Sequence, residues 1–395
     1  MYIPKKPIIL IFIAHYLPGY KSGGPVRSIC NIVEALSEEF EFRIITSDRD
    51  YKESNPYVGI KPNQWQYVGN AQVFYLTPDA FNLKYIVKLL SKTAYDVLYI
   101  NSFFDPITTI RLLIGRRIGL IPEKPVVLAP RGELDLGCMN LKYVKKKLYI
   151  QFAKFFGLYK EITWHASSNY EVLDIMRIMN VKPDLIQIAL NIPTLAKDNE
   201  DYFVPIAQDI EGLKLIFLSR ISREKNLDYA LKVLSLVKAH LIFDIYGTIE
   251  DPKYWDECRE LILKLPSNIK VNYRGNIIHA KVAQIFSQYD LFFFPTRGEN
   301  YGHVIIESLT NGTQVLISKT TPWRNLETDR LGWDFDLASI KSFVNVIENL
   351  ASQNIEQRFE LRKIVKTAML KRLNYQEILR ENFSLFTRCL KNRGA

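Results

Sequence analysis

The sequence predicts an α/β protein built from two doubly wound domains in tandem, with a cleft between them. Short apolar runs typical of strands alternate with segments of helical period. This alternation stops once, in a polar stretch near the middle of the chain, and then resumes. Alternating strands and helices indicate βαβ units and a parallel sheet that helices cover on both faces. The chain has 395 residues, enough for two or three domains of roughly 150 residues each.

The first domain is expected over residues 1–190. Lysines precede its first apolar run, but the run is short and lacks a small-residue cleavage site, so it predicts a buried strand rather than a signal peptide. The expected strands are 8–14, 42–46, 97–100, 126–129 and 186–189, and the expected helices are 25–39, 107–118, 141–156 and 170–179.

A polar, proline-containing stretch over residues 191–212 predicts a linker. The second domain follows over 213–374. Its expected strands are 213–218, 241–246, 269–273, 291–294 and 314–317, and its expected helices are 227–238, 254–263, 280–287 and 304–310. The last sixty or so residues are charged and of helical period. In doubly wound sheets, ligands bind beyond the carboxyl ends of the strands, so the loops that follow the strands are the places to search.

The composition narrows the partners. Lys and Arg number 52 against 42 Asp and Glu, a net charge of +10, which favours an anionic partner such as nucleic acid, an acidic membrane or a phosphorylated ligand. The four cysteines are widely separated and form no CxxC pair. We therefore expect neither a disulfide framework nor a zinc site. A reduced, cytoplasmic protein is expected instead. No apolar run approaches the eighteen or so residues of a membrane-spanning helix.

The first motif is GYKSGGPVRS at 19–28, between the first strand and the first helix. Gly23 and Gly24 allow a ligand to approach the backbone closely, and Pro25 suits the first position of a helix. The N–H groups at such a helix start bind phosphate readily. The spacing is not that of a dinucleotide fingerprint, and a simple tight turn explains the glycines equally well.

The second motif is SRISREKNLDYAL at 219–231, directly after the first strand of the second domain. Arg220, Arg223 and Lys225 are expected to converge there, and Asn226 to cap the next helix. A diphosphate needs such cations, with arginine as a fork and lysine as a point charge. An exposed charged loop is the alternative interpretation.

The third motif, FPTRGENYGHVIIESLTNGTQVLIS at 294–318, is the most informative. Glu299 lies in the loop after a strand and Glu307 lies inside the next helix, so both carboxylates can face one side at the helix start. Carboxylates accept hydrogen bonds from sugar and ribose hydroxyls. The residues between them offer backbone N–H groups to a phosphate; they are Tyr301, Gly302, His303 and Val304. This block therefore has the parts needed to bind a sugar nucleotide.

At these residues the chain resembles the retaining glycosyltransferases of family 4, whose GT-B fold has two Rossmann-like domains. The resemblance rests on the three motifs above and on TPWRNLE at 321–327. It implies transfer of a sugar from a nucleotide donor with retained anomeric configuration, without a metal or a further cofactor. It also implies that Arg220 and Lys225 hold the donor diphosphate, Glu307 the ribose and Glu299 the donor sugar. The final helix, about 375–395, would pack back onto the first domain.

Two residues of the first domain are candidates for contact with the donor sugar or the acceptor. Many relatives carry a histidine where VVLAPRGELD has Arg131, so the residue that contacts the reacting sugar stays open. His15 ends the first strand beside the glycine loop; it is either a ligand contact or an ordinary core histidine. Asp48, Arg49 and Asp50 spell a DxD pattern, which we interpret as a solvated or acceptor-facing loop rather than a metal site.

The stretch 141–160 is basic and rich in aromatic residues, as an interfacial helix would be, although a helix packed on a sheet could look similar. The first domain is expected to bind a glycan or lipid-linked glycan acceptor, in a cytoplasmic enzyme of bacterial surface polysaccharide synthesis. Peripheral contact with the anionic inner face of the membrane is left open. The alternatives are a sugar-nucleotide epimerase of the same fold and a non-catalytic membrane- or nucleic-acid-binding protein. Nucleic acid is not expected as a partner, because we find no aromatic-basic readout motif.

Overall fold

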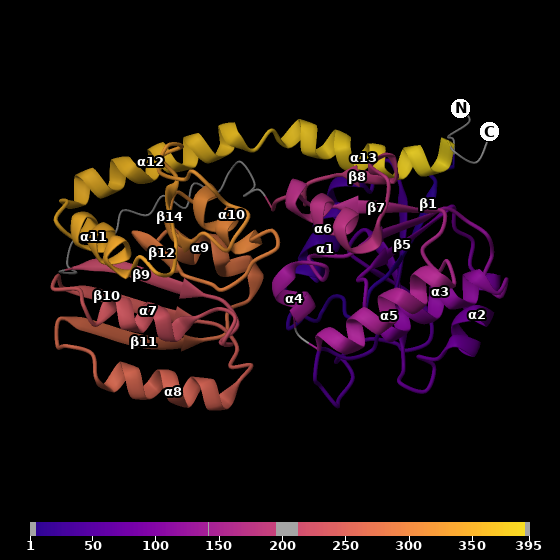
Figure 1. The fold of residues 1–395 in the computed structure, drawn as a ribbon, viewed down its shortest axis with the longest axis horizontal. Coiled ribbons are helices and arrows are strands. Elements are labelled where there is room, and N and C mark those ends of the chain that lie inside the picture. Colours follow the sequence, from indigo (N-terminus) through magenta and orange to yellow (C-terminus); the bar gives the residue numbers. More distant parts are fainter. Residues whose placement is uncertain (1–4, 141, 195–211, 392–395) are drawn as a thin grey trace. The chain divides into compact units, whose positions relative to one another are not determined.

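The computed structural model describes residues 5–140, 142–194 and 212–391 and divides the chain into two compact units (Figure 1). Unit 1 comprises Met1–Ile192 and Tyr375–Ala395, and unit 2 comprises Pro193–Asn374. Residues 195–211 of the predicted linker lie outside the described residues. None of the helices in the described ranges is long and apolar enough to cross a membrane.

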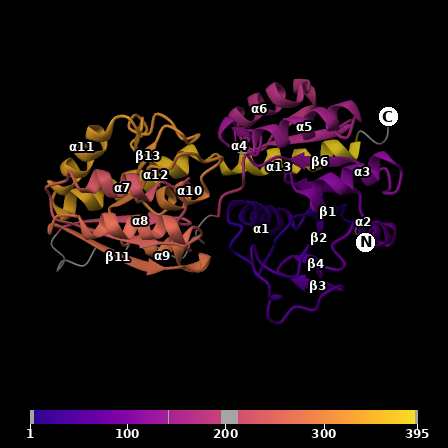
Figure 2. The same cartoon turned by 60° about the horizontal axis from the view of Figure 1, so that its bottom comes forward.

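Unit 1 is built on an eight-stranded sheet with the order β3-β4-β2-β1-β5-β6-β7-β8. All neighbouring strands are parallel except β3 and β4, which pair antiparallel. Figure 2 shows β1, β2, β4 and β3 following one another toward one edge of this sheet. The strands are β1 Ile8–Phe12, β2 Glu41–Ser47, β3 Trp65–Val68, β4 Ala71–Leu76, β5 Val97–Asn101, β6 Val126–Ala129, β7 Ile162–Ala166 and β8 Ile186–Ile188. Every residue of β1 is buried, as expected of a central parallel strand.

The helices of unit 1 are α1 Gly24–Leu36, α2 Leu83–Lys92, α3 Leu112–Arg117, α4 Leu136–Asn140, α5 Tyr143–Phe155, α6 Asn169–Met179 and α13 Tyr375–Lys391, with a π-helical turn over Pro106–Arg111 and a 3-10 turn over Pro183–Leu185. The expected helix 107–118 is therefore two pieces, a π-helical turn capped by Asp105 and the short α3. The C-terminal helix α13, yellow in Figure 1, packs on this unit through Phe386, whose ring contacts Phe40, Phe42 and Tyr99.

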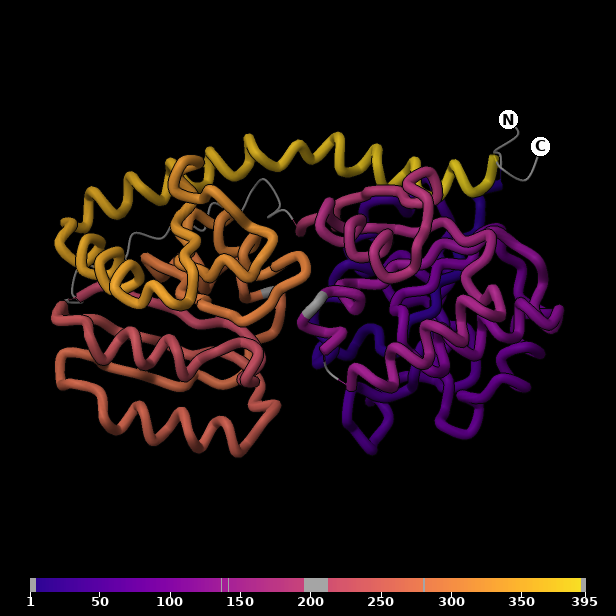
Figure 3. Tube along the Cα trace, in the orientation of Figure 1, coloured from indigo at the N-terminus to yellow at the C-terminus, as the bar shows by residue number. Residues whose placement is uncertain are grey.

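Unit 2 is built on a six-stranded, fully parallel sheet with the order β11-β10-β9-β12-β13-β14. Figure 3 traces the alternation of strand and helix through this unit, from pink to orange. Its elements are β9 Leu213–Leu218, α7 Leu227–Leu234, β10 Leu241–Tyr246, α8 Pro252–Leu263, β11 Ile269–Gly275, a 3-10 turn His279–Lys281, α9 Val282–Phe286, β12 Leu291–Phe294, α10 His303–Thr310, β13 Gln314–Ser318, β14 Gly332–Phe335, α11 Ile340–Ala351 and α12 Ile355–Arg372. The predicted α/β class with two Rossmann-like sheets is confirmed.

Candidate active site

The second and third sequence motifs meet at one edge of the unit 2 sheet. They follow β9 and β12, which are parallel neighbours, so both loops leave the sheet at its carboxyl edge. Backbone contacts join them: Arg297 N donates to Glu224 O at 2.8 Å, and the Thr296 hydroxyl donates to the same carbonyl at 3.1 Å. The Asn226 amide donates to Pro295 O at 2.8 Å. The two loops are therefore joined by hydrogen bonds of both backbone and side chains.

Lys225 brings the chemistry of the two loops together. The residue is only 7% exposed, and its Nζ lies 3.2 Å from Glu299 Oε2 and 3.3 Å from Gly298 O. The ammonium also stands 5.8 Å from the ring centroid of Phe294. A cation and a carboxylate from different motifs are thus held next to each other.

Each of the three cations of the second motif has an acidic partner of its own. Arg220 Nη1 lies 2.8 Å from Glu250 Oε2, in the loop after β10. Arg223 instead pairs with Glu257 of α8, at 2.5 Å, and its guanidinium stands over the ring of Tyr254. Arg223 also pairs with Asp251, just before α8, at 3.6 Å.

Asn226 stands at the start of α7 with φ of 64°. Its side chain makes no capping hydrogen bond to the helix, contrary to the sequence expectation. The amide is used instead to join the two loops, donating to Pro295 O and accepting from Arg297 Nε at 2.9 Å.

The two glutamates of the third motif have separate partners. Glu299 accepts from the N–H of Asn300 at 3.1 Å in addition to its contact with Lys225. Glu307 lies on α10, is 8% exposed, and has its Oε1 3.2 Å from His279 Nε2. His279 could not be predicted from the sequence, because a lone histidine at the start of an expected helix belongs to no motif. In the structure, His279 is the neighbour of Glu307, the residue expected to bind the ribose.

The start of α10 depends on Gly302. This residue has φ of 81°, where a side chain is strained. A Cβ there would also meet Ile305 Cδ1 at 2.9 Å and Trp323 Nε1 at 3.1 Å. Trp323 in turn donates to Tyr301 O at 2.7 Å, fixing the turn before the helix. Burial raises the pKa of the Tyr301 hydroxyl well above its ordinary value, so this hydroxyl is neutral.

The helix itself begins at His303, one residue earlier than expected, with Val304 next. The His303 ring contacts the Tyr301 ring edge to face, with centroids 4.9 Å apart. The backbone N–H groups at this helix start are the predicted phosphate donors.

The glycine loop of unit 1 is held by the DxD segment. Gly23, with φ of 65°, stands at the N-cap of α1, and Gly24 is the first helical residue. The Asp50 carboxylate accepts from the N–H groups of Tyr20 and Lys21 at 2.9 and 3.2 Å. Asp48 is buried as well. The expectation of a solvated loop is therefore wrong for both carboxylates, which are occupied in shaping the loop.

His15, the first of the two candidates in unit 1, is partly buried beside this loop. Its Nδ1 lies 3.0 Å from Arg49 O, and its ring meets that of Tyr51 edge to face. Because a carbonyl oxygen only accepts, Nδ1 carries the proton.

Arg131, the second candidate, is a cross-link between segments that are distant in sequence. Its backbone is left-handed, with φ of 57°. Its guanidinium donates to Asn101 Oδ1 at 2.6 Å, to the Tyr99 hydroxyl at 2.7 Å and to Asn191 Oδ1. All three of its nitrogens are thus used on oxygen atoms of this chain.

The network continues into the core through His165. The Tyr99 hydroxyl lies 2.8 Å from His165 Nδ1, and His165 Nε2 lies 2.8 Å from Ala189 O. The proton is therefore on Nε2, and Nδ1 accepts from Tyr99. Burial, assisted by the charge of Arg131, lowers the pKa of His165 to about 3. A neutral histidine in this tautomer links β7 to Tyr99 of β5 and to Ala189, just after β8.

The comparisons agree with this architecture. The family model of glycosyl transferases group 1 matches residues 198–368. This range falls in unit 2. The two Rossmann-like sheets, of which that of unit 2 is fully parallel, have the GT-B architecture that glycosyltransferases share. Over residues 198–368, which make up less than half of the chain, the protein is similar to the glycosyl transferases of group 1; membership of family 4 in particular stays a prediction.

Two curated proteins are similar over part of their length. The chain is 28% identical over 139 residues to the GtfA subunit of a UDP-N-acetylglucosamine–peptide N-acetylglucosaminyltransferase of Streptococcus pneumoniae serotype 4. That alignment covers 34% of this chain and 26% of the relative. The chain is also 21% identical over 253 residues to an uncharacterized 41.2 kDa protein in the cps region of Klebsiella pneumoniae. This second alignment covers 62% of this chain and 66% of that protein.

Solved structures share the fold over nearly the whole chain. Anabaena HepE, in complex with UDP and glucose, superposes with a TM-score of 0.70 at 14% identity and covers 97% of this chain and 100% of its own. The sucrose-phosphate synthase of Thermosynechococcus elongatus gives 0.71 at 15% identity, with 98% and 100% covered. WaaG, a glycosyltransferase involved in lipopolysaccharide biosynthesis, gives 0.66 at 13% identity, with 95% and 99% covered.

Proposed function

We propose that this chain transfers a hexosyl group from a nucleotide-sugar donor to a glycan, with retention of configuration at the anomeric carbon. The contact between Lys225 and Glu299 carries the proposal. It holds a cation suited to a diphosphate next to a carboxylate suited to sugar hydroxyls. Anabaena HepE, which shares the fold, binds UDP and glucose, and this supports a nucleotide sugar as the donor.

The proposed roles follow from the chemistry of each group. Arg220 and Lys225 bind the diphosphate and stabilise the negative charge that develops on the leaving nucleotide. Glu299 orients the donor sugar, and Glu307, held beside His279, accepts from the ribose hydroxyls. The N–H groups at the start of α10, at residues 301–304, bind phosphate, and Gly23 and Gly24 are proposed to do so in unit 1.

We also propose that transfer needs no divalent metal. The two cations of the site supply the positive charge that a metal would give to the leaving diphosphate. The DxD carboxylate of Asp50 is already engaged by backbone N–H groups, and Asp48 pairs with Arg49 at 2.8 Å. Transfer should therefore continue at its full rate in EDTA.

The acceptor is proposed to be a glycan or lipid-linked glycan in bacterial surface polysaccharide synthesis, bound by unit 1 on the cytoplasmic side of the membrane. The similarity to a Klebsiella pneumoniae protein of the cps region and the fold shared with WaaG support this role. His15, rather than Arg131, is the proposed contact of unit 1 with the reacting sugar.

The test is a panel of nucleotide sugars with polysaccharide-derived acceptors, followed by NMR of the anomeric proton in the product. A product with the donor's anomeric configuration, lost in Lys225→Met, supports the proposal. An inverted product overturns the retaining mechanism. Donor incubated without acceptor is the control: conversion to an epimer there would overturn transfer itself.

A further inference from the structure

The outward side of α5 carries a continuous apolar stripe. Val144, Leu148, Phe152 and Phe155 recur every three or four residues, which places them on one side of the helix. All four are exposed, Phe155 at 84% and Val144 at 67%. Phe156, which follows the last helical residue, adds another exposed ring 4.5 Å from that of Phe152. Contiguous exposed apolar surface of this kind marks interaction sites.

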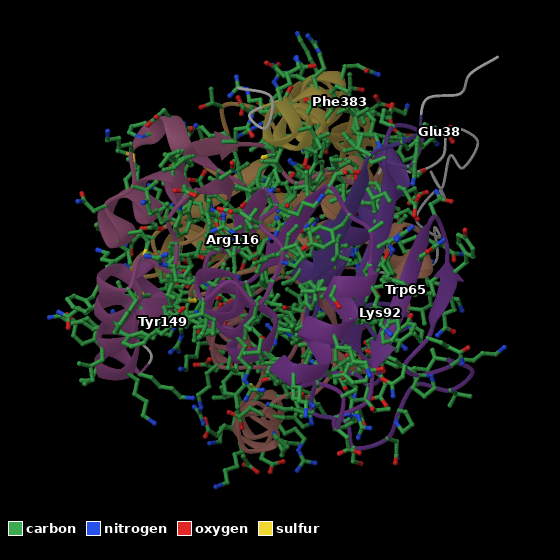
Figure 4. All side chains as sticks on the ribbon, turned by 90° about the vertical axis from the view of Figure 1, so that its right-hand side faces the viewer. Glu38, Trp65, Lys92, Arg116, Tyr149 and Phe383 are labelled. Carbon is green, nitrogen blue, oxygen red and sulfur yellow. The ribbon has the colours of Figure 1, made fainter. Side chains whose placement is uncertain are left out.

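The opposite side of α5 anchors the helix to unit 1. Ile150 and Ala153 are buried there. Lys146 lies on this side too, with its Nζ 2.6 Å from Cys138 O and 4.7 Å from the ring centroid of Phe104. Figure 4 shows α5, located by Tyr149, at the margin of the unit with side chains projecting away from it. The core thus already has its contacts from this helix, and the stripe is not needed to hold α5 in place.

Exposed cations border the stripe. Lys145 and Lys147 flank it near its start, and Lys154 flanks it one to two turns later. Residues 142–160 contain six lysines and no acidic residue. At the far end, Arg117 Nε donates to Phe156 O at 3.0 Å, so the last residue of α3 borders the stripe as well.

We propose that this surface docks onto an anionic phospholipid bilayer. The helix would lie in the plane of the interface, with its apolar side chains in the acyl boundary and its ammonium groups at lipid phosphates. The α5 surface consists of Val144, Lys145, Lys147, Leu148, Phe152, Lys154, Phe155 and Phe156. Docking would bring unit 1 to lipid-linked acceptors; that purpose rests on the proposed function, whereas the docking itself does not.

The charge of the surface favours a membrane over a second copy of this chain. A symmetric dimer through α5 would place lysines of one copy near those of the other without an acidic residue from 142–160 to pair with them. An anionic bilayer supplies the complementary charge at every lysine, worth roughly a fivefold gain in binding for each one near the surface.

The experiment is co-sedimentation with vesicles of phosphatidylglycerol and phosphatidylcholine, compared with vesicles of phosphatidylcholine alone. Wild type should bind the anionic vesicles at low salt, and binding should weaken as ionic strength rises. The triple variant Lys145→Gln, Lys147→Gln, Lys154→Gln should bind roughly a hundredfold more weakly. Leu148→Ser and Phe155→Ser should each cost about tenfold, since each removes a large side chain from the apolar contact.

Unit 2 offers matched controls, the triple Lys253→Gln, Lys264→Gln, Lys270→Gln and the exposed helical Leu263→Ser. These should bind vesicles like wild type. The proposal would be overturned if the wild-type protein did not bind anionic vesicles. It would also be overturned if the controls lost as much vesicle binding as the α5 variants. A wild-type dimer, by light scattering, that Phe155→Ser dissociates would overturn it as well. UDP binding, measured by calorimetry without vesicles, reports separately on the proposed function.

Discussion

Replacing Lys225 by methionine tests the centre of the proposed site. The substitution removes the ammonium that contacts Glu299 and keeps an unbranched side chain over the ring of Phe294. Loss of one preorganised group that stabilises developing charge costs about 2.7–4 kcal/mol of transition-state stabilisation. Turnover should therefore fall between about 100-fold and 1,000-fold.

The structure also bounds the effect of this change on stability. The side chains of Lys225 and Glu299 are 9% and 21% exposed, so their pair is neither at the surface nor fully buried. Surface pairs contribute up to about 1 kcal/mol, and breaking a fully buried pair costs 3–5 kcal/mol. Because Glu299 keeps its bond from the Asn300 N–H, we expect a loss of about 1–2 kcal/mol. That lowers Tm by roughly 2–8 °C, and the protein stays folded at 25 °C.

The matched control is Arg223→Met, in the same loop. Arg223 is 54% exposed and pairs with Glu257 and Asp251, so its loss should leave turnover within about twofold of wild type. The assay measures initial transfer rates with each variant, together with its melting curve. A folded Lys225→Met protein with wild-type turnover, or equal losses for both variants, would refute the assigned role of Lys225.

Three further predictions concern other groups. Glu307→Ala should weaken calorimetric binding of both nucleoside diphosphate and sugar nucleotide by about 10- to 100-fold, and Glu299→Ala only that of the sugar nucleotide; equal losses for both ligands in both variants would contradict the assignment. The folded-state pKa of His165, about 3, lies below its ordinary 6.5, so its contribution to stability is complete above pH 6.5 and declines as pH falls, by about 2 kcal/mol at pH 5. In denaturant titrations, His165→Gln should lose less stability than wild type between pH 7.5 and pH 5, and parallel losses would exclude this explanation. Gly302→Ala should destabilise the protein by about 1–3 kcal/mol, because Gly302 has a positive φ and close neighbours. Gly298→Ala should be nearly neutral, because the nearest atom to a Cβ there is a side-chain atom at 3.7 Å. Matching melting curves for the two variants would show that the turn at Gly302 tolerates a Cβ.

The strands of unit 2 could be predicted because each is a short apolar run between polar loops. The strand predicted over 291–294 is β12 with the same bounds. β14 was not predicted, since only its first residue is buried and the segment Gly332–Phe335 shows no apolar run. Burial on both faces is what makes a parallel strand visible in sequence.

Unit 1 was harder to predict, and β7 shows why. Its sequence, ITWHA, contains His165, which is buried in a hydrogen-bonded network rather than exposed. A polar residue in the core interrupts the apolar pattern, so the strand was not predicted. The antiparallel β3 was not predicted either. None of its residues is fully buried, so its sequence has no run of core residues.

The types of residue in the site could be predicted, but their partners could not. Arg223 and Lys225 stand two residues apart in a charged loop, and nothing local shows that one is bound by α8 and the other by Glu299. The partners come from other strands and helices, so only the tertiary structure distinguishes a paired surface cation from a buried one.

Hydrogen bonding distinguishes the two unit 1 candidates for contact with the reacting sugar, Arg131 and His15. Each of the three guanidinium nitrogens of Arg131 donates to a group of this chain, Asn101, Asn191 or Tyr99, and turning it toward a ligand would leave these groups without that partner. His15 uses only its protonated Nδ1, on the Arg49 carbonyl. In the neutral ring, Nε2 is then a hydrogen-bond acceptor, which suits a sugar hydroxyl. We therefore favour His15 as the residue that contacts the sugar. Arg131 instead holds together the ends of the strands that contact its own side chain.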